Sequence, residues 1–142
     1  MLGDNRKNRI LSTALVAGLL VLIWGNSLLN ADISSAISRF VGTLLGGGRP
    51  MADGTQSHHI LRKLAHFSEF TALGFSLTWR LNLKDRRWSL PLLLGLLVAC
   101  VDESIQLYVP GRSGQVSDVW IDFAGACLGW CVFRLVTRPR KR

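Results

Sequence analysis

The sequence predicts an all-α protein, an integral membrane four-helix bundle that forms a single domain over residues 1–142. Two observations carry this prediction. No residue from Ile10 to Ala31 is charged, and an apolar run of this length crosses the ~30 Å hydrocarbon core as a helix. Three later segments each join an apolar half to a charged half, and the order of the halves reverses from one segment to the next.

The first span is expected at about residues 10–29. Its start is similar to a signal peptide, because Arg6, Lys7 and Arg9 precede the apolar stretch. The stretch is longer than a signal-peptide core of ~7–15 residues, and no A-x-A cleavage site follows it. We therefore interpret it as a retained first helix, with cleavage after Ala31 as the alternative.

The other spans are expected at about 60–83, 88–108 and 117–136. The charged half comes first in the second span, last in the third and first again in the fourth. We expect all three to score poorly on a plain hydropathy scan for this reason. In an up-down bundle the reversals bring the three polar halves to one membrane face, where the first span also ends.

The long connection between the first two spans contains a short amphipathic segment, Ala31 to Leu45. Its apolar residues recur at helical spacing: Ile33, Ile37, Phe40, Val41 and Leu44. Such a pattern suits a helix that lies on the bilayer surface, and a lid over the polar cluster is the competing interpretation. Further along, His58 and His59 are expected to be loop residues at the membrane surface.

Basic residues indicate which face is which. They gather before the first span, between the second and third, and after the fourth: Arg6, Lys7, Arg9, Lys84, Arg86, Arg87, Arg138, Arg140, Lys141 and Arg142. An even number of spans puts these clusters on one side, which the positive-inside rule identifies as the cytoplasm. Both termini are then cytoplasmic, and the polar cluster opens on the extracytoplasmic side of a bacterial cytoplasmic membrane. The membrane also explains the net charge of +8 better than a nucleic acid partner does.

Charged groups inside membrane helices are costly, so they usually face the bundle interior and serve a function. The groups selected as candidate catalytic residues are His66, Glu69, Asp102, Glu103 and Asp118. The groups selected as substrate-binding residues are Asn26, Ser27, Lys63, Gln106, Arg112 and Asp122. Asp118 and Asp122 share a helical stripe with Gly125 and Gly129, a G-x-x-x-G seam at which another helix can approach closely. Arg112, in a turn, is expected above the carboxylates, where a guanidinium binds a carboxylate or phosphate bidentately.

A purely structural network of ion pairs is the alternative to a functional site, and His66 is then a hydrogen-bonded packing residue. Five carboxylates face only Lys63, Arg112 and His66. This acidic excess favours protonated carboxyl groups, a bound cation or acid-base chemistry. No residue is assigned as a metal ligand, and a divalent cation on His66, Glu69 and carboxylates of other helices is kept as an alternative.

The same residues carry a family resemblance. Lys63-x-x-His66-x-x-Glu69-Phe70, Asp102-Glu103-x-x-Gln106, Pro110-Gly111-Arg112 and Asp118-x-x-x-Asp122-x-x-Gly125 follow one another along the chain. In this order the motifs resemble the VanZ-like family, over about Ile10 to Leu135. The resemblance implies a bacterial polytopic membrane protein, and the family is named for low-level resistance to the glycopeptide teicoplanin. Asp122 departs from the family's common asparagine and adds a negative charge there.

These observations predict a membrane protein that acts on or binds a cell-envelope lipid or lipid-linked substrate, with teicoplanin resistance as an associated role. Whether it is an enzyme stays open, because no Ser-His-Asp or phosphatase motif is present. A lipid- or lipoglycopeptide-binding module without chemistry is the other main hypothesis. The expected partners are membrane lipids and an anionic headgroup or lipophilic glycopeptide, with a homo-oligomer as a further option.

Overall fold

The structure, a computed structural model, describes residues 6–29, 55–81 and 89–137, with single positions between 33 and 44. This described part holds four long helices and no strand: α1 (Arg6–Leu28), α3 (Thr55–Leu81), α4 (Ser89–Gln106) and α5 (Val116–Val136). The predicted all-α, four-helix architecture is confirmed.

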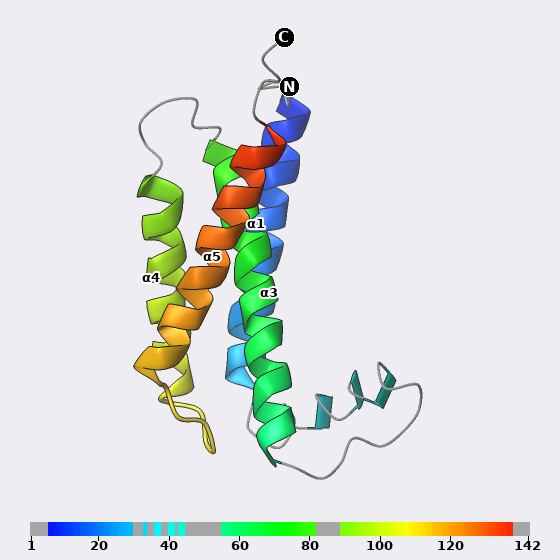
Figure 1. Ribbon diagram of the computed structural model, residues 1–142, viewed down its shortest axis with the longest axis vertical. Coiled ribbons are helices and arrows are strands. Elements are labelled where there is room, and N and C mark those ends of the chain that lie inside the picture. The colour runs from blue at the N-terminus through cyan, green and yellow to red at the C-terminus, as the bar shows by residue number, and fades with distance from the viewer. Residues whose placement is uncertain are drawn as a thin grey trace.

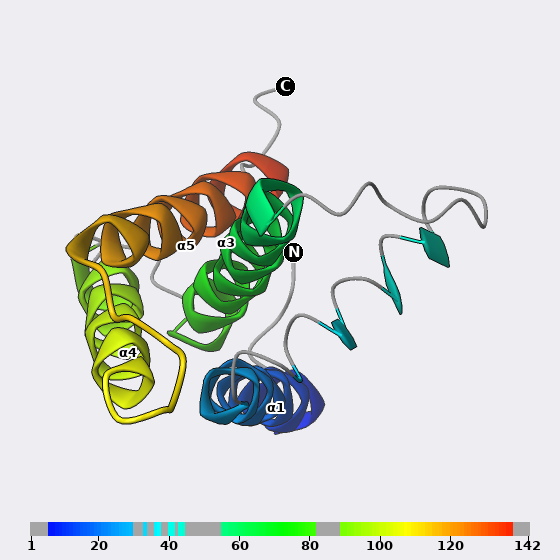
Figure 2. The same ribbon diagram turned by 90° about the horizontal axis from the view of Figure 1, so that it is seen from below.

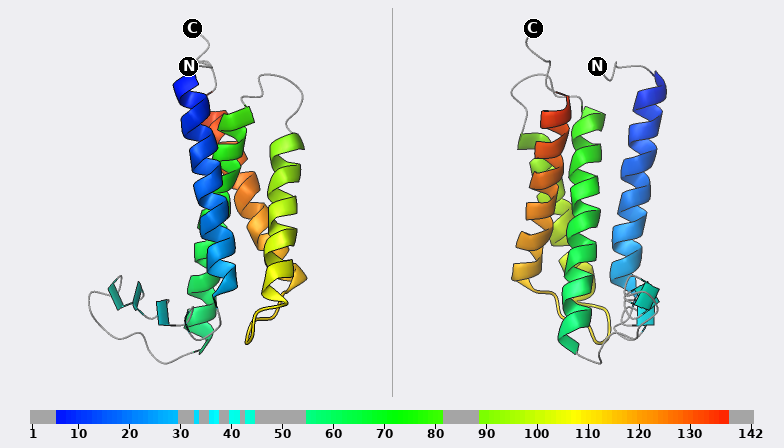
Figure 3. Two further views of the ribbon diagram at one scale, coloured as in Figure 1. Left: turned by 180° about the vertical axis from the view of Figure 1, so that it is seen from behind. Right: turned by 45° about the vertical axis from the view of Figure 1, so that its right-hand side comes forward.

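The helices run alternately up and down, and the beginning of α1 lies at the same end of the bundle as the end of α5 (Figures 1 and 3). Seen along the bundle, α3 lies between α1 and α5 (Figure 2). It packs against all three other helices. The first half of α3, the end of α4 and the start of α5 therefore share one end of the bundle, as the reversals of charge predict.

The helix bounds differ most from expectation at the start of α3. The second span is expected from about residue 60, but α3 begins at Thr55. His58 and His59 therefore belong to a helix, and their prediction as loop residues is wrong. The reason is local, because no glycine or proline interrupts the chain between Gly54 and Gly74, so helical geometry continues back to Thr55.

Three of the described helices, α1, α4 and α5, are long and apolar enough to cross a membrane. The expectation that all three later spans score poorly is therefore wrong for α4 and α5. Only two charged residues, Asp102 and Glu103, interrupt α4, whereas α3 carries charges at both ends, including Arg62, Lys63 and Arg80. The apolar remainder of α4 and α5 outweighs their carboxylates.

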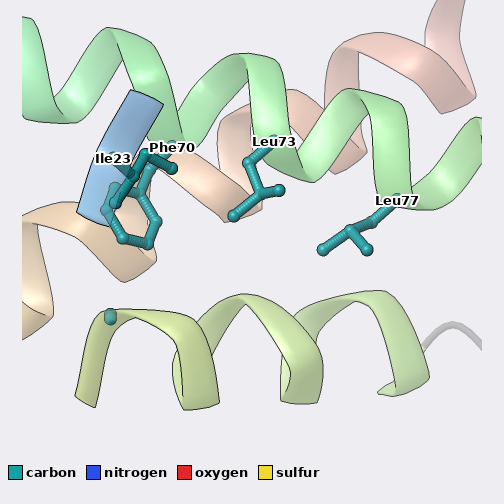
Figure 4. Packing of buried hydrophobic residues seen from close by; sticks show 5 residues of the cluster. Ile23, Phe70, Leu73 and Leu77 are labelled. Carbon is teal, nitrogen blue, oxygen red and sulfur yellow. The ribbon is translucent and has the colours of Figure 1, made fainter. Parts of the chain in front are cut away.

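The distribution of side chains over the bundle is the reverse of a soluble protein's. Leucines such as Leu22, Leu97 and Leu135 are exposed, while Asp102 and Asp122 are buried. The apolar core is small: Ile23, Phe70, Leu73, Leu77 and Ala99. Figure 4 shows the α3 members of this core directed toward α4, with Ile23 of α1 beside Phe70. An apolar exterior around a polar interior fits a bundle surrounded by lipid.

Close packing of α5 against α3 depends on glycine. A β-carbon at Gly125 would lie 2.5 Å from the main-chain oxygen of Phe67, and one at Gly129 would overlap that of Thr71. On the facing helix, a β-carbon at Gly74 would overlap the main chain of Ala126. The predicted glycine seam is confirmed, and it directs Asp122, one turn before Gly125, toward the interior.

The amphipathic segment is seen only at its described positions. Ile33, Ile37, Phe40, Val41 and Leu44 are helical there and exposed, with Phe40 67% accessible. These pieces extend to one side of the bundle, at the end where α1 stops and α3 begins (Figure 1). The described positions of this segment are thus helical, as its periodicity predicts.

Replacing Gly129 with alanine is expected to destabilise the bundle. The added methyl group must separate α3 from α5, and overpacking of this kind costs about 1–3 kcal/mol. The free energy of unfolding in detergent micelles, measured by denaturant titration, should fall by this amount.

Gly18→Ala is the matched control, because nothing lies within 4 Å of a β-carbon at this position of α1. Helix propensity alone then makes the alanine variant as stable as the parent or slightly more stable. Equal stability of the Gly129→Ala and Gly18→Ala proteins would contradict the claim that close packing of α5 against α3 depends on glycine.

Candidate functional site

Side chains from all four helices gather at the end of the bundle where α1 and α4 stop and α3 and α5 begin. Most of them are buried although they are polar: Ser27, His66, Asp102, Glu103, Gln106 and Asp122. Buried polar groups are costly without partners, so the partners of each group show what holds the site together.

Asp102 is fully buried and lies at the centre of a hydrogen-bond network. The Ser27 hydroxyl donates to Oδ1 over 2.7 Å, and the Gln106 amide donates to Oδ2 over 3.0 Å. Ser27 belongs to α1, while Gln106 lies one turn after Asp102 on α4. The network fixes the carboxylate and joins α1 to α4.

Glu103 is held from two directions. The Gln106 amide donates to its Oε1 over 3.2 Å, and the main-chain N–H of Gln115 donates to its Oε2 over 2.8 Å. Gln115 immediately precedes α5, so this carboxylate binds an otherwise unpaired donor at the helix start. Both oxygens are thus paired, and the bond to Gln115 ties the end of α4 to the start of α5.

Lys63 and Asp118 form an ion pair between α3 and α5, with 2.6 Å between Nζ and Oδ1. The Lys63 side chain is 39% exposed and that of Asp118 16%, so the pair lies at the rim of the site. An ion pair this accessible contributes little to stability, and the lysine can exchange its partner for an incoming anion.

Arg112 lies close enough to Asp102 and Glu103 to interact with their charges, but it donates its hydrogen bonds to main-chain carbonyls. Its Nε donates to the Leu29 carbonyl over 3.1 Å and its Nη2 to the Asn26 carbonyl over 2.9 Å. Both carbonyls lie at the end of α1, where main-chain oxygens lack partners within the helix, and the Asn26 carbonyl also accepts from the Leu29 N–H over 3.3 Å. The guanidinium group therefore binds main chain rather than a carboxylate. Its third nitrogen, Nη1, is buried and has no partner among the described residues. Burial lowers the pKa of Arg112, and the nearby charge of Arg62 adds to this effect.

Glu69 lies on the side of α3 that meets α1. Its Oε1 accepts a long hydrogen bond, 3.5 Å, from the Asn26 side-chain amide. Its Oε2 is buried and unpaired within the described part of the chain. One oxygen of this carboxyl group is therefore available for a proton, a water molecule or a ligand.

His66 of α3 and Asp122 of α5 are both buried deep in the site. Neither ring nitrogen of His66, nor Oδ2 of Asp122, has a hydrogen-bond partner among the described residues. The closest acidic neighbour of the imidazole is Asp102, with 3.7 Å between Nδ1 and Oδ2, which is too long for a hydrogen bond.

A small cavity opens beside these two side chains. It is lined by Arg62, Lys63, His66, Glu103, Gln106, Asp118, Ile121 and Asp122. Its volume of about 10 Å³ is close to that needed by one water molecule. The cavity can therefore accept a water molecule, an ion or one polar atom of a larger ligand.

Sequence reasoning did not select Arg62, Gln115 or Ile121 for the site. Arg62 could have been found from its spacing, because it precedes His66 by four residues and so shares its helix face. The Gln115 contact uses a main-chain N–H, and side-chain pattern gives no signal for it.

Comparison with known proteins identifies a family for this chain. Residues 10–137 match the family described as VanZ/LLP1, which covers most of the chain. Neither the curated proteins nor the solved structures gave a match to this sequence.

Removing the Ser27 hydroxyl is expected to destabilise the protein. In Ser27→Ala the buried Asp102 loses its shortest hydrogen bond, and an unsatisfied buried group costs about 1–3 kcal/mol. The loss should appear as a lower free energy of unfolding in micelles.

Ser104→Ala provides the comparison, because Ser104 is exposed on α4 and its hydroxyl bonds only to the Cys100 carbonyl of its own helix. That variant should unfold at the parent's free energy. A Ser27→Ala protein as stable as Ser104→Ala would show that the network is not needed for stability.

Proposed function

The chain belongs to the VanZ/LLP1 family, and we propose that its polar site binds the anionic headgroup of a cell-envelope lipid or lipid-linked molecule. The observation that carries the proposal is the cavity between α3, α4 and α5, in which Arg62 and Lys63 stand beside buried polar groups. It opens at one end of a bundle that exposes many large apolar side chains along its length.

The cations at the cavity support an anionic ligand. Lys63 is accessible, Arg62 lines the same opening, and Arg112 is close enough to feel the charge of Arg62. Cations held this close repel one another, and an anion between them relieves the repulsion. A phosphate or carboxylate headgroup supplies such a charge, and guanidinium groups bind either one.

Exposed apolar residues beside the cavity support an amphiphile rather than a small free anion. Leu64 follows Lys63 on α3, and Trp120 precedes Ile121 on α5, and both are more than half exposed. An acyl or prenyl chain can lie along these residues while one oxygen of its headgroup enters the cavity. The exposed apolar positions from Ile33 to Leu44 suit a helix on the bilayer surface better than a lid, since a lid would bury them.

The proposed orientation puts both termini in the cytoplasm and the cavity on the extracytoplasmic side of a bacterial membrane. Its support is the positive-inside rule: in the sequence, the basic groups of residues 6–9, 84–87 and 138–142 stand at the start of α1, between α3 and α4, and after α5. These ends of the described helices lie opposite the cavity (Figure 1). Glycopeptides act outside the cell, so a contribution to teicoplanin resistance is compatible with this orientation.

Acid-base chemistry on the bound molecule is a second candidate, favoured by His66. Both nitrogens of this imidazole lack partners among the described side chains, and it lies at the cavity together with Asp122. A histidine in this position can take or give a proton once a substrate is bound. Glu69, with one unpaired oxygen, is the other candidate acid or base.

The orientation predicts opposite labelling of two engineered cysteines. With Cys100, Cys127 and Cys131 replaced by serine, Tyr108→Cys should react with a membrane-impermeant maleimide in intact cells. Tyr108 is 88% exposed in the connection between α4 and α5. Arg142→Cys should react only after lysis, and the reverse pattern would invert the proposed topology.

Anionic amphiphiles are expected to stabilise the purified protein. Phosphatidylglycerol, a polyprenyl phosphate or teicoplanin should raise its melting temperature in neutral detergent, because a ligand that binds only the folded state stabilises it. Arg62→Gln should weaken the apparent affinity for the lipids about tenfold, which corresponds to ~1.4 kcal/mol.

Arg80→Gln, the same change at the other end of α3, is the control and should leave the affinity unchanged. Equal stabilisation by phosphatidylcholine, or equal affinity in both variants, would contradict headgroup binding at the cavity. Mass spectrometry of the recovered amphiphile separates the two candidate functions, since a chemically altered product would indicate the enzyme.

A further inference from the structure

Three buried donor groups of the types that bind metal ions lie close together, and two of them, His66 and Asp122, line the cavity. His66 of α3, Asp102 of α4 and Asp122 of α5 each offer one ligand atom, and these atoms lie within 4.8 Å of one another. The closest measured pair, His66 Nδ1 and Asp102 Oδ2, is 3.7 Å apart. Donors bound to one ion at about 2.0–2.2 Å lie up to about 4.4 Å apart. A small movement of these side chains therefore brings all three onto one ion.

Two of the three groups, His66 and Asp122, lack contacts that would explain their burial, whereas Asp102 accepts hydrogen bonds from Ser27 and Gln106. His66 is 6% exposed, Asp122 2% and Asp102 0%. Both nitrogens of His66 and Oδ2 of Asp122 have no hydrogen-bond partner within the described chain. Buried polar atoms without partners are rare in native structures, and an ion is one of the explanations they call for.

The balance of charges in the site also favours a bound cation. Three cations, Arg62, Lys63 and Arg112, face five carboxylates, and the excess is two negative charges. The carboxylates are Glu69, Asp102, Glu103, Asp118 and Asp122. Unpaired charge is costly to bury inside a membrane bundle. One divalent cation removes the excess of two.

From this geometry we propose that His66, Asp102 and Asp122 bind one divalent transition-metal ion. One imidazole and two carboxylates suit ions such as Mn²⁺ and Zn²⁺. Three protein ligands leave coordination positions open, and the cavity lined by His66 and Asp122 gives access to them. Ser27 and Gln106 hold Asp102 in place, as supporting hydrogen bonds do for metal-binding carboxylates.

The ion would add a further positive charge beside Arg62 and Lys63, so it deepens the proposed headgroup function. Its open positions accept the oxygens of a phosphate or carboxylate headgroup. Binding of the ion itself does not require a lipid, and the two proposals can be tested separately.

The test is metal binding to the purified full chain, prepared in detergent through a tag that contains no histidine and stripped with a chelator. Titration with MnCl₂, followed by electron paramagnetic resonance, should give one bound ion per chain, and ZnCl₂ should displace it. His66→Gln and Asp122→Asn should each weaken the affinity for Mn²⁺ at least tenfold.

The double variant His58→Gln/His59→Gln is the control, because it removes the other two of the three histidines and should bind Mn²⁺ like the parent. In this background His66 is the sole histidine, so pulsed resonance should still detect one imidazole nitrogen bound to Mn²⁺. This second measurement does not depend on whether His66→Gln folds.

Absence of Mn²⁺ and Zn²⁺ binding, or absence of the nitrogen signal in the double variant, would overturn the metal site. Unchanged affinity in folded His66→Gln and Asp122→Asn proteins would overturn it equally. Stabilisation by anionic lipid that persists in the metal-free protein would leave the headgroup proposal standing, whereas metal binding without lipid stabilisation would remove the headgroup proposal alone.

Discussion

The close approach of α5 to α3 is the constraint on which the polar site depends. Gly74, Gly125 and Gly129 leave no room for a β-carbon between the two backbones. With the helices this close, Asp118 forms its ion pair with Lys63. A carboxylate oxygen of Asp122 also lies within 4.8 Å of an imidazole nitrogen of His66. A larger residue in the seam would move these pairs apart, so helix packing and site geometry are set by the same glycines.

The membrane sets the second constraint, because polar groups inside the bundle must be satisfied by protein. The sequence satisfies some of them by pairing helices, as Ser27 and Gln106 do for Asp102 and Gln115 does for Glu103. It leaves others unsatisfied in the described chain: three unpaired atoms belong to His66 and Asp122, which line the cavity, and three to Trp24, Glu69 and Arg112. A purely structural network would have no reason to leave the atoms of His66 and Asp122 unpaired where a ligand can reach them.

The sequence was enough to predict the architecture because the fold follows from patterns that repeat along each helix. Reversal of charged and apolar halves predicted the shared polar end, and the spacing of Gly125 and Gly129 predicted the close approach. Contacts made by loops could not be predicted in this way. Arg112 was expected to bind carboxylates, but it donates to the carbonyls of Asn26 and Leu29. The direction of a turn depends on tertiary packing, and the sequence of a turn carries no periodic pattern from which that direction could be predicted.

The last turn of α1 has a larger part in the site than its sequence suggests. Asn26 accepts a hydrogen bond from Arg112 and donates one to Glu69, and the next residue, Ser27, donates to Asp102. Two adjacent residues thereby contact the α4–α5 connection, α3 and α4. Between its charged start and this last turn, α1 exposes apolar residues such as Val21 and Leu22, and contact with lipid does not fix the position of a helix along its axis. These polar contacts hold α1 at the site, and α1 in turn closes the side of the bundle on which Asp102 is buried.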